Sequence, residues 1–229
     1  MKKRIFILAS IVLFTSYAQA QEYLIDKMSL PDIGGEIGFY ADIDVKEDIK
    51  ILYDLQTAPS QRARAELSAS EVKSLISSLE KPIQYYTKWS KLAHDIGFRL
   101  LSKKFPTIFA DQNIYFTQEG KWYYESGVDM CAKFYVDIDG ECHFILESDY
   151  MTSKELAAQS SSVGLSFAGS LLHGVLGIGS SESEITIGRY CAGSYLSFKT
   201  VDEIKGFIKK LQDAVDWKKQ NISDGKVLK

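Results

Sequence analysis

Two stretches of this chain repeat the same patterns in the same order, and this repeat constrains the fold more than any other feature. The sequence FYADID at residues 39–44 recurs as FYVDID at residues 134–139. A Ser/Thr-x-x-Glu pattern followed by apolar residues at helical spacing occurs at 68–79 and again at 200–211. The second copy carries about 37 more residues between its two parts. We therefore predict a duplicated β-hairpin plus α-helix unit, with convergent patterning as the alternative.

The strand patterns of both copies predict hairpins with one buried face. Apolar and polar residues alternate through 37–45 and again through 49–55, which is the period of a half-buried strand. In the second copy, Asp137 and Gly140 fit the first and fourth positions of a type I turn followed by a left-handed glycine. That turn places Phe134 opposite Phe144 on one face.

The helix patterns begin with capping boxes. Ser68 and Thr200 can each accept a hydrogen bond from the backbone three residues on, where a glutamate can reach back to the cap. Apolar residues then recur at i, i+3, i+4 and i+7, so each helix has one stripe that can cover a sheet. The helical stripe continues past Pro82, which should kink or restart the helix, and Gly97 should end it.

These elements predict an α+β fold. Residues 107–116 and 121–125 also have strand patterns, joined around Gly120. We expect an antiparallel β-sheet, or two related sheets, with helices packed on one face. Within a single domain at 21–229, repeat 1 covers about 36–82, a connecting helix and strands cover 83–127, and repeat 2 covers about 130–217 with an insertion at 151–187.

Residues 1–20 have the features of a secretory signal peptide. Lys2, Lys3 and Arg4 precede an apolar stretch at residues 5–14 that is too short to span a bilayer, and the stretch leads to Ala18-Gln19-Ala20. We expect cleavage near Ala20 and a secreted or periplasmic mature chain that begins at or close to Gln21.

The charge balance argues against two classes of partner. The mature chain would carry a formal charge of about −6. This sign disfavours nucleic acid and anionic membrane surfaces. Its apolar content of 45% is sufficient for a packed core.

The three cysteines allow one disulfide bond in an oxidising compartment. Cys131 and Cys142 lie near opposite ends and on opposite faces of the second hairpin, about 16 Å apart, so they should not bond to each other. We predict Cys131 with Cys191, and three buried thiols are the alternative.

Candidate metal ligands are weak. Asp137 and Asp139 share a strand face, as carboxylates that bind calcium can do, but turn chemistry already explains Asp137. The three histidines have no ligand spacing. We expect no metal and no cofactor.

The residues most suited to ligand binding are aromatic or lie in the insertion. Residues 156–181 contain five glycines and no charge, which suggests a mobile flap or a closely packed helix. We select Trp122, Tyr124, Phe167 and His173 as candidate ligand contacts, although strand aromatics more often serve packing.

These features favour a non-enzymatic binding or interaction protein with a protein or small-molecule ligand. Oligomerisation through residues 160–180 is possible. One alternative is a small secreted hydrolase that uses carboxylates or a thiol under a glycine-rich flap, with Cys191, His143 and Asp137 as the residues to substitute in a test. Another is a membrane-active protein that uses residues 163–178.

Overall fold

The computed structural model describes residues 21–43, 49–58, 61–105, 109–148, 151 and 193–223. They form an α+β fold of one antiparallel sheet and two long helices. The strands are β1 (Gln21–Leu30), β2 (Gly35–Ile43), β3 (Ile49–Leu55), β4 (Ala63–Leu67), β5 (Leu101–Lys104), β6 (Phe109–Gln118), β7 (Lys121–Val136), β8 (Cys142–Ser148) and β9 (Tyr195–Phe198). The helices are α1 (Ala69–Ile96) and α4 (Val201–Ser223), and a short 3-10 turn, η1 (Pro31–Ile33), joins β1 to β2.

The strands follow the order β1-β2-β3-β4-β6-β7-β8-β9, and β5 pairs with β7 off this path. The sheet curves enough for its ends to meet. Gln56, just after β3, forms an isolated antiparallel bridge with Tyr195 of the last strand, with both backbone hydrogen bonds made. The turn η1 also lies against β9. Distant strands are therefore brought to one place.

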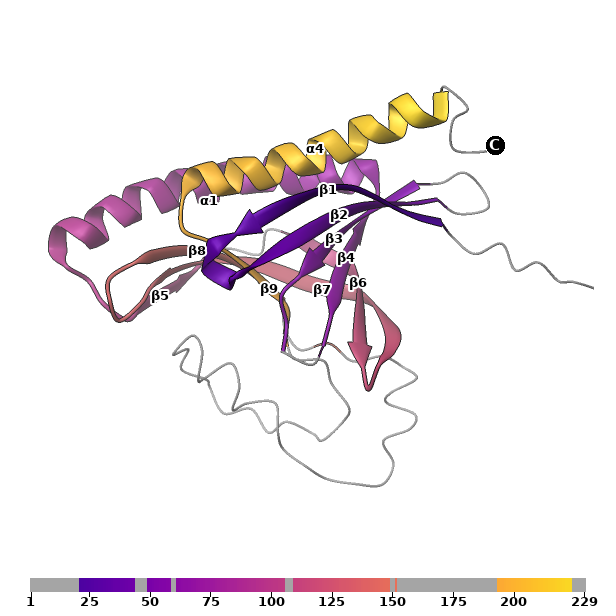
Figure 1. Ribbon diagram of the computed structural model, residues 1–229. Coiled ribbons are helices and arrows are strands. Elements are labelled where there is room, and N and C mark those ends of the chain that lie inside the picture. The colour runs from indigo at the N-terminus through magenta and orange to yellow at the C-terminus, as the bar shows by residue number, and fades with distance from the viewer. Residues whose placement is uncertain are drawn as a thin grey trace, which may run out of the picture.

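Both helices lie on the same side of the sheet, next to each other (Figure 1). Helix α4 contacts β1, β2, β3 and β9, whereas α1 contacts β4, β7 and β8. Each helix therefore covers strands that belong to the other half of the chain.

Aromatic side chains fill the space between the helices and the sheet. Phe207 of α4 packs against Phe39, Tyr53 and Phe198, with ring centroids 5.3–5.9 Å apart. Under α1, the ring of Phe134 meets Tyr86 at 5.9 Å and Trp89 at 5.7 Å. The buried side chains form one continuous core cluster.

The predicted hairpins are confirmed within the described residues. In the first, Phe39 pairs with Tyr53 across β2 and β3. In the second, Phe134 pairs with Phe144 and Val136 with Cys142, as the turn predicted. Gly140 has a φ of 87°, a left-handed conformation that favours glycine.

Both capping boxes are also confirmed. Ser68 accepts from the Glu71 backbone and the Glu71 carboxylate accepts from the Ser68 backbone. Thr200 and Glu203 make the same exchange at the start of α4. Gly97 ends α1 with a φ of 74°. The predicted restart at Pro82 is wrong: α1 continues through Pro82, whose ring is buried in the core-facing stripe.

The turn between β6 and β7 uses Glu119 and Gly120, both with positive φ. β7 then runs unbroken to Val136, so two predicted strands are one. β1, β4 and the short β5 were not predicted. The residues 1–20, 152–192 and 224–229, which include the predicted signal peptide and most of the insertion, lie outside the described part of the chain.

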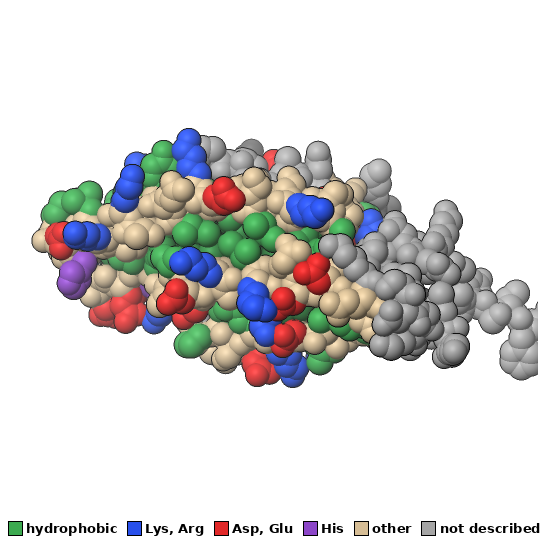
Figure 2. Space-filling model, turned by 90° about the horizontal axis from the view of Figure 1, so that it is seen from above, with side chains coloured by type: hydrophobic (Ala, Val, Ile, Leu, Met, Phe, Trp, Pro, Cys, Tyr) green, Lys and Arg blue, Asp and Glu red, His purple; other side chains and the backbone are tan. Residues whose placement is uncertain are grey.

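The helix side of the molecule carries hydrophobic side chains along its middle, with charged groups scattered around them (Figure 2). Ile76 and Ile83 of α1 and Ile208 of α4 are partly buried and pack against the core. Among the described helices, none is long and apolar enough to cross a membrane.

Candidate functional site

Five charged or titratable side chains meet where the β7–β8 hairpin, η1 and the start of α4 come together. We call them the charged cluster: Asp32, Asp137, Glu141, His143 and Lys199. Nδ1 of His143 lies 2.8 Å from Oδ2 of Asp32, and Nε2 lies 3.3 Å from Oδ2 of Asp137. Lys199 Nζ lies 2.5 Å from Glu141 and 3.5 Å from Asp32.

Local structure holds these groups in place. The Asp137 carboxylate accepts a hydrogen bond from the Glu141 backbone at 2.8 Å, so the hairpin turn fixes its orientation. His143 follows Cys142 on β8 and faces away from the core side occupied by Phe144. Asp32 reaches the cluster because η1 lies against β9, where Ser197 also hydrogen-bonds to its carboxylate.

The electrostatics of the charged cluster favour ionised groups. Burial opposes ionisation of Asp32, but hydrogen bonds from His143 and Ser197 and the charge of Lys199 outweigh it and lower the pKa of Asp32 to about 2. Burial also opposes the charged form of His143, yet Asp32 and Asp137 raise the pKa of its imidazole above 6.5. The pKa of Asp137 is lowered, because hydrogen bonds from the Glu141 backbone and from His143 outweigh its burial.

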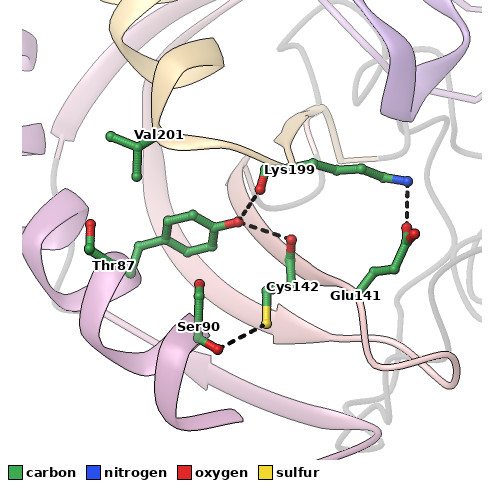
Figure 3. Close-up of a pocket in the computed structure, with 7 residues that line it drawn as sticks. Thr87, Ser90, Glu141, Cys142, Lys199 and Val201 are labelled. Carbon is green, nitrogen blue, oxygen red and sulfur yellow. Dashed lines mark hydrogen bonds and ion pairs between the residues drawn. The ribbon is translucent and has the colours of Figure 1, made fainter. Parts of the chain in front are cut away.

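A shallow pocket of about 450 Å³ adjoins the charged cluster on the helix side (Figure 3). Its wall contains Tyr86, Thr87, Ser90, Glu141, Cys142, Lys199 and Val201. The Tyr86 hydroxyl lies 2.9 Å from the Cys142 carbonyl and 2.6 Å from the Lys199 carbonyl. In Figure 3 the Lys199 side chain extends away from this hydroxyl toward Glu141. The Tyr86 hydroxyl therefore links α1 to the first residue of β8 and to the segment between β9 and α4.

The Cys142 thiol lines the pocket, and no imidazole of the described residues lies beside it. Cys142 Sγ lies 4.0 Å from the Ser90 carbonyl. Burial raises the pKa of this thiol, which lowers the fraction of nucleophilic thiolate. His143 points to the opposite face of β8, toward Asp32 and Asp137. The structure therefore does not bring these two residues together as a thiol–imidazole pair.

A second group of side chains, two of them exposed and three half-buried, lies on the sheet face opposite the helices. We call it the aromatic face: Tyr40, Arg64, Tyr115, Trp122 and Tyr124. Trp122 and Tyr124 are 46% and 45% exposed. Tyr123 between them packs against the core and stacks on Phe116. Alternation along β7 thus separates the packing aromatic from the two exposed ones.

Hydrogen bonds and ring contacts hold the aromatic face rigid. The Arg64 guanidinium lies over the Tyr40 ring at 4.3 Å and over the Trp122 ring at 5.5 Å. It also pairs with Asp54 at 2.8 Å and with Glu22 at 2.7 Å.

The other half of the aromatic face is held in the same way. The ring of Tyr124 lies 5.1 Å from that of Tyr115. The Tyr115 hydroxyl bonds to Glu66 at 3.0 Å. Because these side chains are already held, a partner that binds here would lose little affinity to the ordering of side-chain rotamers.

The residues selected from the sequence fall in different places. Trp122 and Tyr124 belong to the aromatic face. Asp137 belongs to the charged cluster, but its predicted partner Asp139 is exposed and is not part of it. Cys131 and Cys142 are not joined to each other by a disulfide, as the hairpin register predicted. Phe167, His173 and Cys191 lie outside the described residues.

Sequence reasoning missed three members of the charged cluster: Asp32, Glu141 and Lys199. Glu141 could have been found, because the turn prediction places it next to Asp137 at the hairpin end. Asp32 and Lys199 carry no such signal, since the contact of η1 with β9 brings Asp32 to His143 and the pairing of β8 with β9 brings Lys199 to the cluster.

Comparison with models of protein families, with curated proteins and with solved structures finds no match.

Proposed function

We propose that this chain is exported after removal of residues 1–20 and acts as a non-enzymatic binding protein whose aromatic face contacts a protein partner. The observation that carries this proposal is the pair of half-exposed rings, Trp122 and Tyr124, fixed beside Arg64 on a rigid sheet. Trp, Tyr and Arg are the residue types most enriched at the energetic centres of protein interfaces.

The charges around the aromatic face suggest the character of the partner. Two carboxylates, Glu22 and Asp54, pair with the single guanidinium of Arg64, and a third, Glu66, accepts a hydrogen bond from the Tyr115 hydroxyl. The set therefore has an excess of negative charge, and a partner with basic residues around an apolar centre would complement it.

The pocket supports binding rather than thiol chemistry. The Cys142 thiol has a raised pKa, and none of the described residues places an imidazole beside it. Activation of a thiol nucleophile normally needs a lowered pKa or an adjacent base. The hydrolase alternative gains no support from the described residues.

We also propose that the two halves derive from one duplicated unit. Each half contributes four consecutive strands to the main path of the sheet and then a capped helix, and the short β5 is an addition in the second half. Phe39 on β2 and Phe134 on β7 each lie on the second strand of these sets of four, and each packs under a helix. The domain boundaries predicted above remain part of this proposal, and the insertion at 151–187 would distinguish the second copy.

Export has a direct test. The mature protein isolated from the medium or periplasm should begin at or close to Gln21, as intact mass spectrometry can measure. A full-length chain retained in the cytoplasm would contradict the export part of the proposal.

Partner binding can be tested by placing a photo-cross-linking amino acid at Lys121, which is exposed at the edge of the aromatic face. We expect a covalent adduct in the native host, and we expect the added substitutions Trp122→Ala and Tyr124→Ala to reduce its yield at least about tenfold. The matched control carries the same label at Lys205, an exposed position on α4. Identical adducts from both positions, or an adduct that survives both alanine substitutions, would contradict the proposal.

A further inference from the structure

Three possible metal ligands converge at the end of the β7–β8 hairpin. One ligand atom each from Asp137, Glu141 and His143 lie within 4.8 Å of one another. An imidazole nitrogen and two carboxylate oxygens at this separation can converge on one ion. We propose that these three residues form a binding site for a divalent first-row transition cation of the Zn²⁺ or Mn²⁺ type.

The second ring nitrogen of His143 is already oriented as a metal site requires. Histidine ligands usually donate their other ring N–H to a carboxylate, which fixes the ring and makes the ligating nitrogen more basic. Nδ1 of His143 lies 2.8 Å from Asp32, which leaves Nε2 facing Asp137 at 3.3 Å. Asp32 is in turn held by Ser197. Asp32 thus has a positioning role behind the ligands.

The carboxylate ligands differ in how firmly they are held. Asp137 uses one oxygen to accept from the Glu141 backbone at 2.8 Å, so its other oxygen is fixed toward His143. Glu141 is exposed and its only described ion-pair partner is Lys199, so its side chain can turn toward an ion. Two ligands are therefore preorganised and the third can close on the ion.

The charge of the site fits a divalent cation. With a neutral imidazole, Asp32, Asp137 and Glu141 contribute three negative charges against the single positive charge of Lys199. A doubly charged ion would balance the remaining charge. Lys199 competes for the same oxygens because its Nζ lies 2.5 Å from Glu141.

One imidazole nitrogen and two carboxylate oxygens suit some metal ions better than others. Calcium takes six to eight oxygen ligands, which this hairpin end does not provide. Imidazole favours Zn²⁺ and its neighbours, and carboxylates also suit Mn²⁺. Three protein ligands would leave a coordination position for water, as in open zinc sites.

Calorimetric titration of the metal-stripped mature protein with Zn²⁺ alone tests the proposal. We expect one Zn²⁺ per chain, weakened at least about tenfold by Glu141→Gln. Asp139→Asn is the matched control, because Asp139 is an exposed carboxylate in the same turn that lies outside the cluster. It should leave the affinity unchanged. Lys199→Gln should tighten binding, because it removes the competing cation.

All three substitutions lie on exposed or half-exposed side chains, so the fold should persist, and circular dichroism can confirm this. Failure of the wild type to bind Zn²⁺ or Mn²⁺ would overturn the proposal. Equal weakening by Glu141→Gln and Asp139→Asn would also overturn it, since it would indicate non-specific attraction to the acidic turn. An unchanged affinity in Lys199→Gln would place the ion elsewhere. None of these results depends on whether the aromatic face binds a partner.

Discussion

Asp32 and His143 are 111 residues apart in the sequence, yet their side chains are joined at 2.8 Å. Asp32 lies in the turn that follows the first strand, and His143 lies on β8. The contact therefore links the two ends of the sheet. It also joins two groups whose pKa values move in opposite directions, so its contribution to stability must depend on pH.

We predict that this contribution is largest between about pH 4 and pH 6.5. The pKa of Asp32 is lowered from 3.8 to about 2, so its contribution is present above pH 3.8 and is lost as the pH falls toward 2. The pKa of His143 is raised from 6.5, so its contribution is complete below 6.5 and is lost as the pH rises through the folded-state pKa.

Urea unfolding of the wild type and Asp32→Asn measures this dependence, with EDTA present to exclude metal effects. The stability difference should be about 1–2 kcal/mol near pH 5.5, after allowance for solvent screening. It should shrink at pH 2.5 and at pH 8.5. Asp137 and Lys199 also face this pair, so some dependence should remain in the variant. A difference that is constant with pH would contradict the prediction.

Phe39→Ala and Phe134→Ala should each lower the free energy of unfolding by about 3–5 kcal/mol, because each removes a fully buried ring beneath a helix. The control is Ile138→Ala, which truncates a side chain that is 69% exposed at the hairpin turn and should change stability by less than about 0.5 kcal/mol. Chemical denaturation measures all three. A small effect at one phenylalanine only would argue against equivalent roles in the two halves.

The pair Lys133–Glu147 offers a test of buried charge. Lys133 is 1% exposed and lies 2.9 Å from Glu147. Glu147→Gln should destabilise the protein by about 3 kcal/mol, because it leaves the lysine buried without a counter-charge.

The substitution Lys133→Met, which removes that buried charge, should cost much less than Glu147→Gln or stabilise the protein. Lys27→Met breaks the exposed pair with Glu36 and should change stability by less than about 1 kcal/mol. Thermal melting ranks the variants, and a larger loss from Lys133→Met than from Glu147→Gln would refute this account.

The N-terminal caps of α1 and α4 should contribute equally to the free energy of unfolding. Ser68→Ala and Thr200→Ala each remove a side-chain acceptor from a helix N-terminus and should cost about 1 kcal/mol. Ser77→Ala is the control, since Ser77 is an exposed residue in the interior of α1, away from its N-terminus. The same loss at Ser77 would show that capping is not the cause.

The elements that could be predicted are those whose local patterns agree with their final environment. Both capped helices and the 137–140 turn belong to this group. β1 was missed because a bulge between Leu24 and Asp26 shifts its register, which breaks the period-two pattern. β4 was missed because it alternates alanine with Arg64 and Glu66, residues with weak strand preference.

The candidate sites, too, could be predicted only where a local sequence pattern marks their residues. Trp122 and Tyr124 could be selected because aromatic residues at alternate strand positions share a face. The charged cluster could not, since Asp32, His143 and Lys199 are brought together by strand order and by η1, neither of which leaves a spacing in the sequence.

The exchange of helices between the halves has a consequence for biosynthesis. The strands β1 to β3 receive their apolar cover from α4, which the ribosome makes near the end of translation. Until that helix emerges, the rings of Phe39 and Tyr53 have no partner from Phe207, and the N-terminal half cannot reach its stable form. Folding of the N-terminal half should therefore follow the synthesis of α4, and a chain that ends before Val201 should leave these two rings without their helical cover.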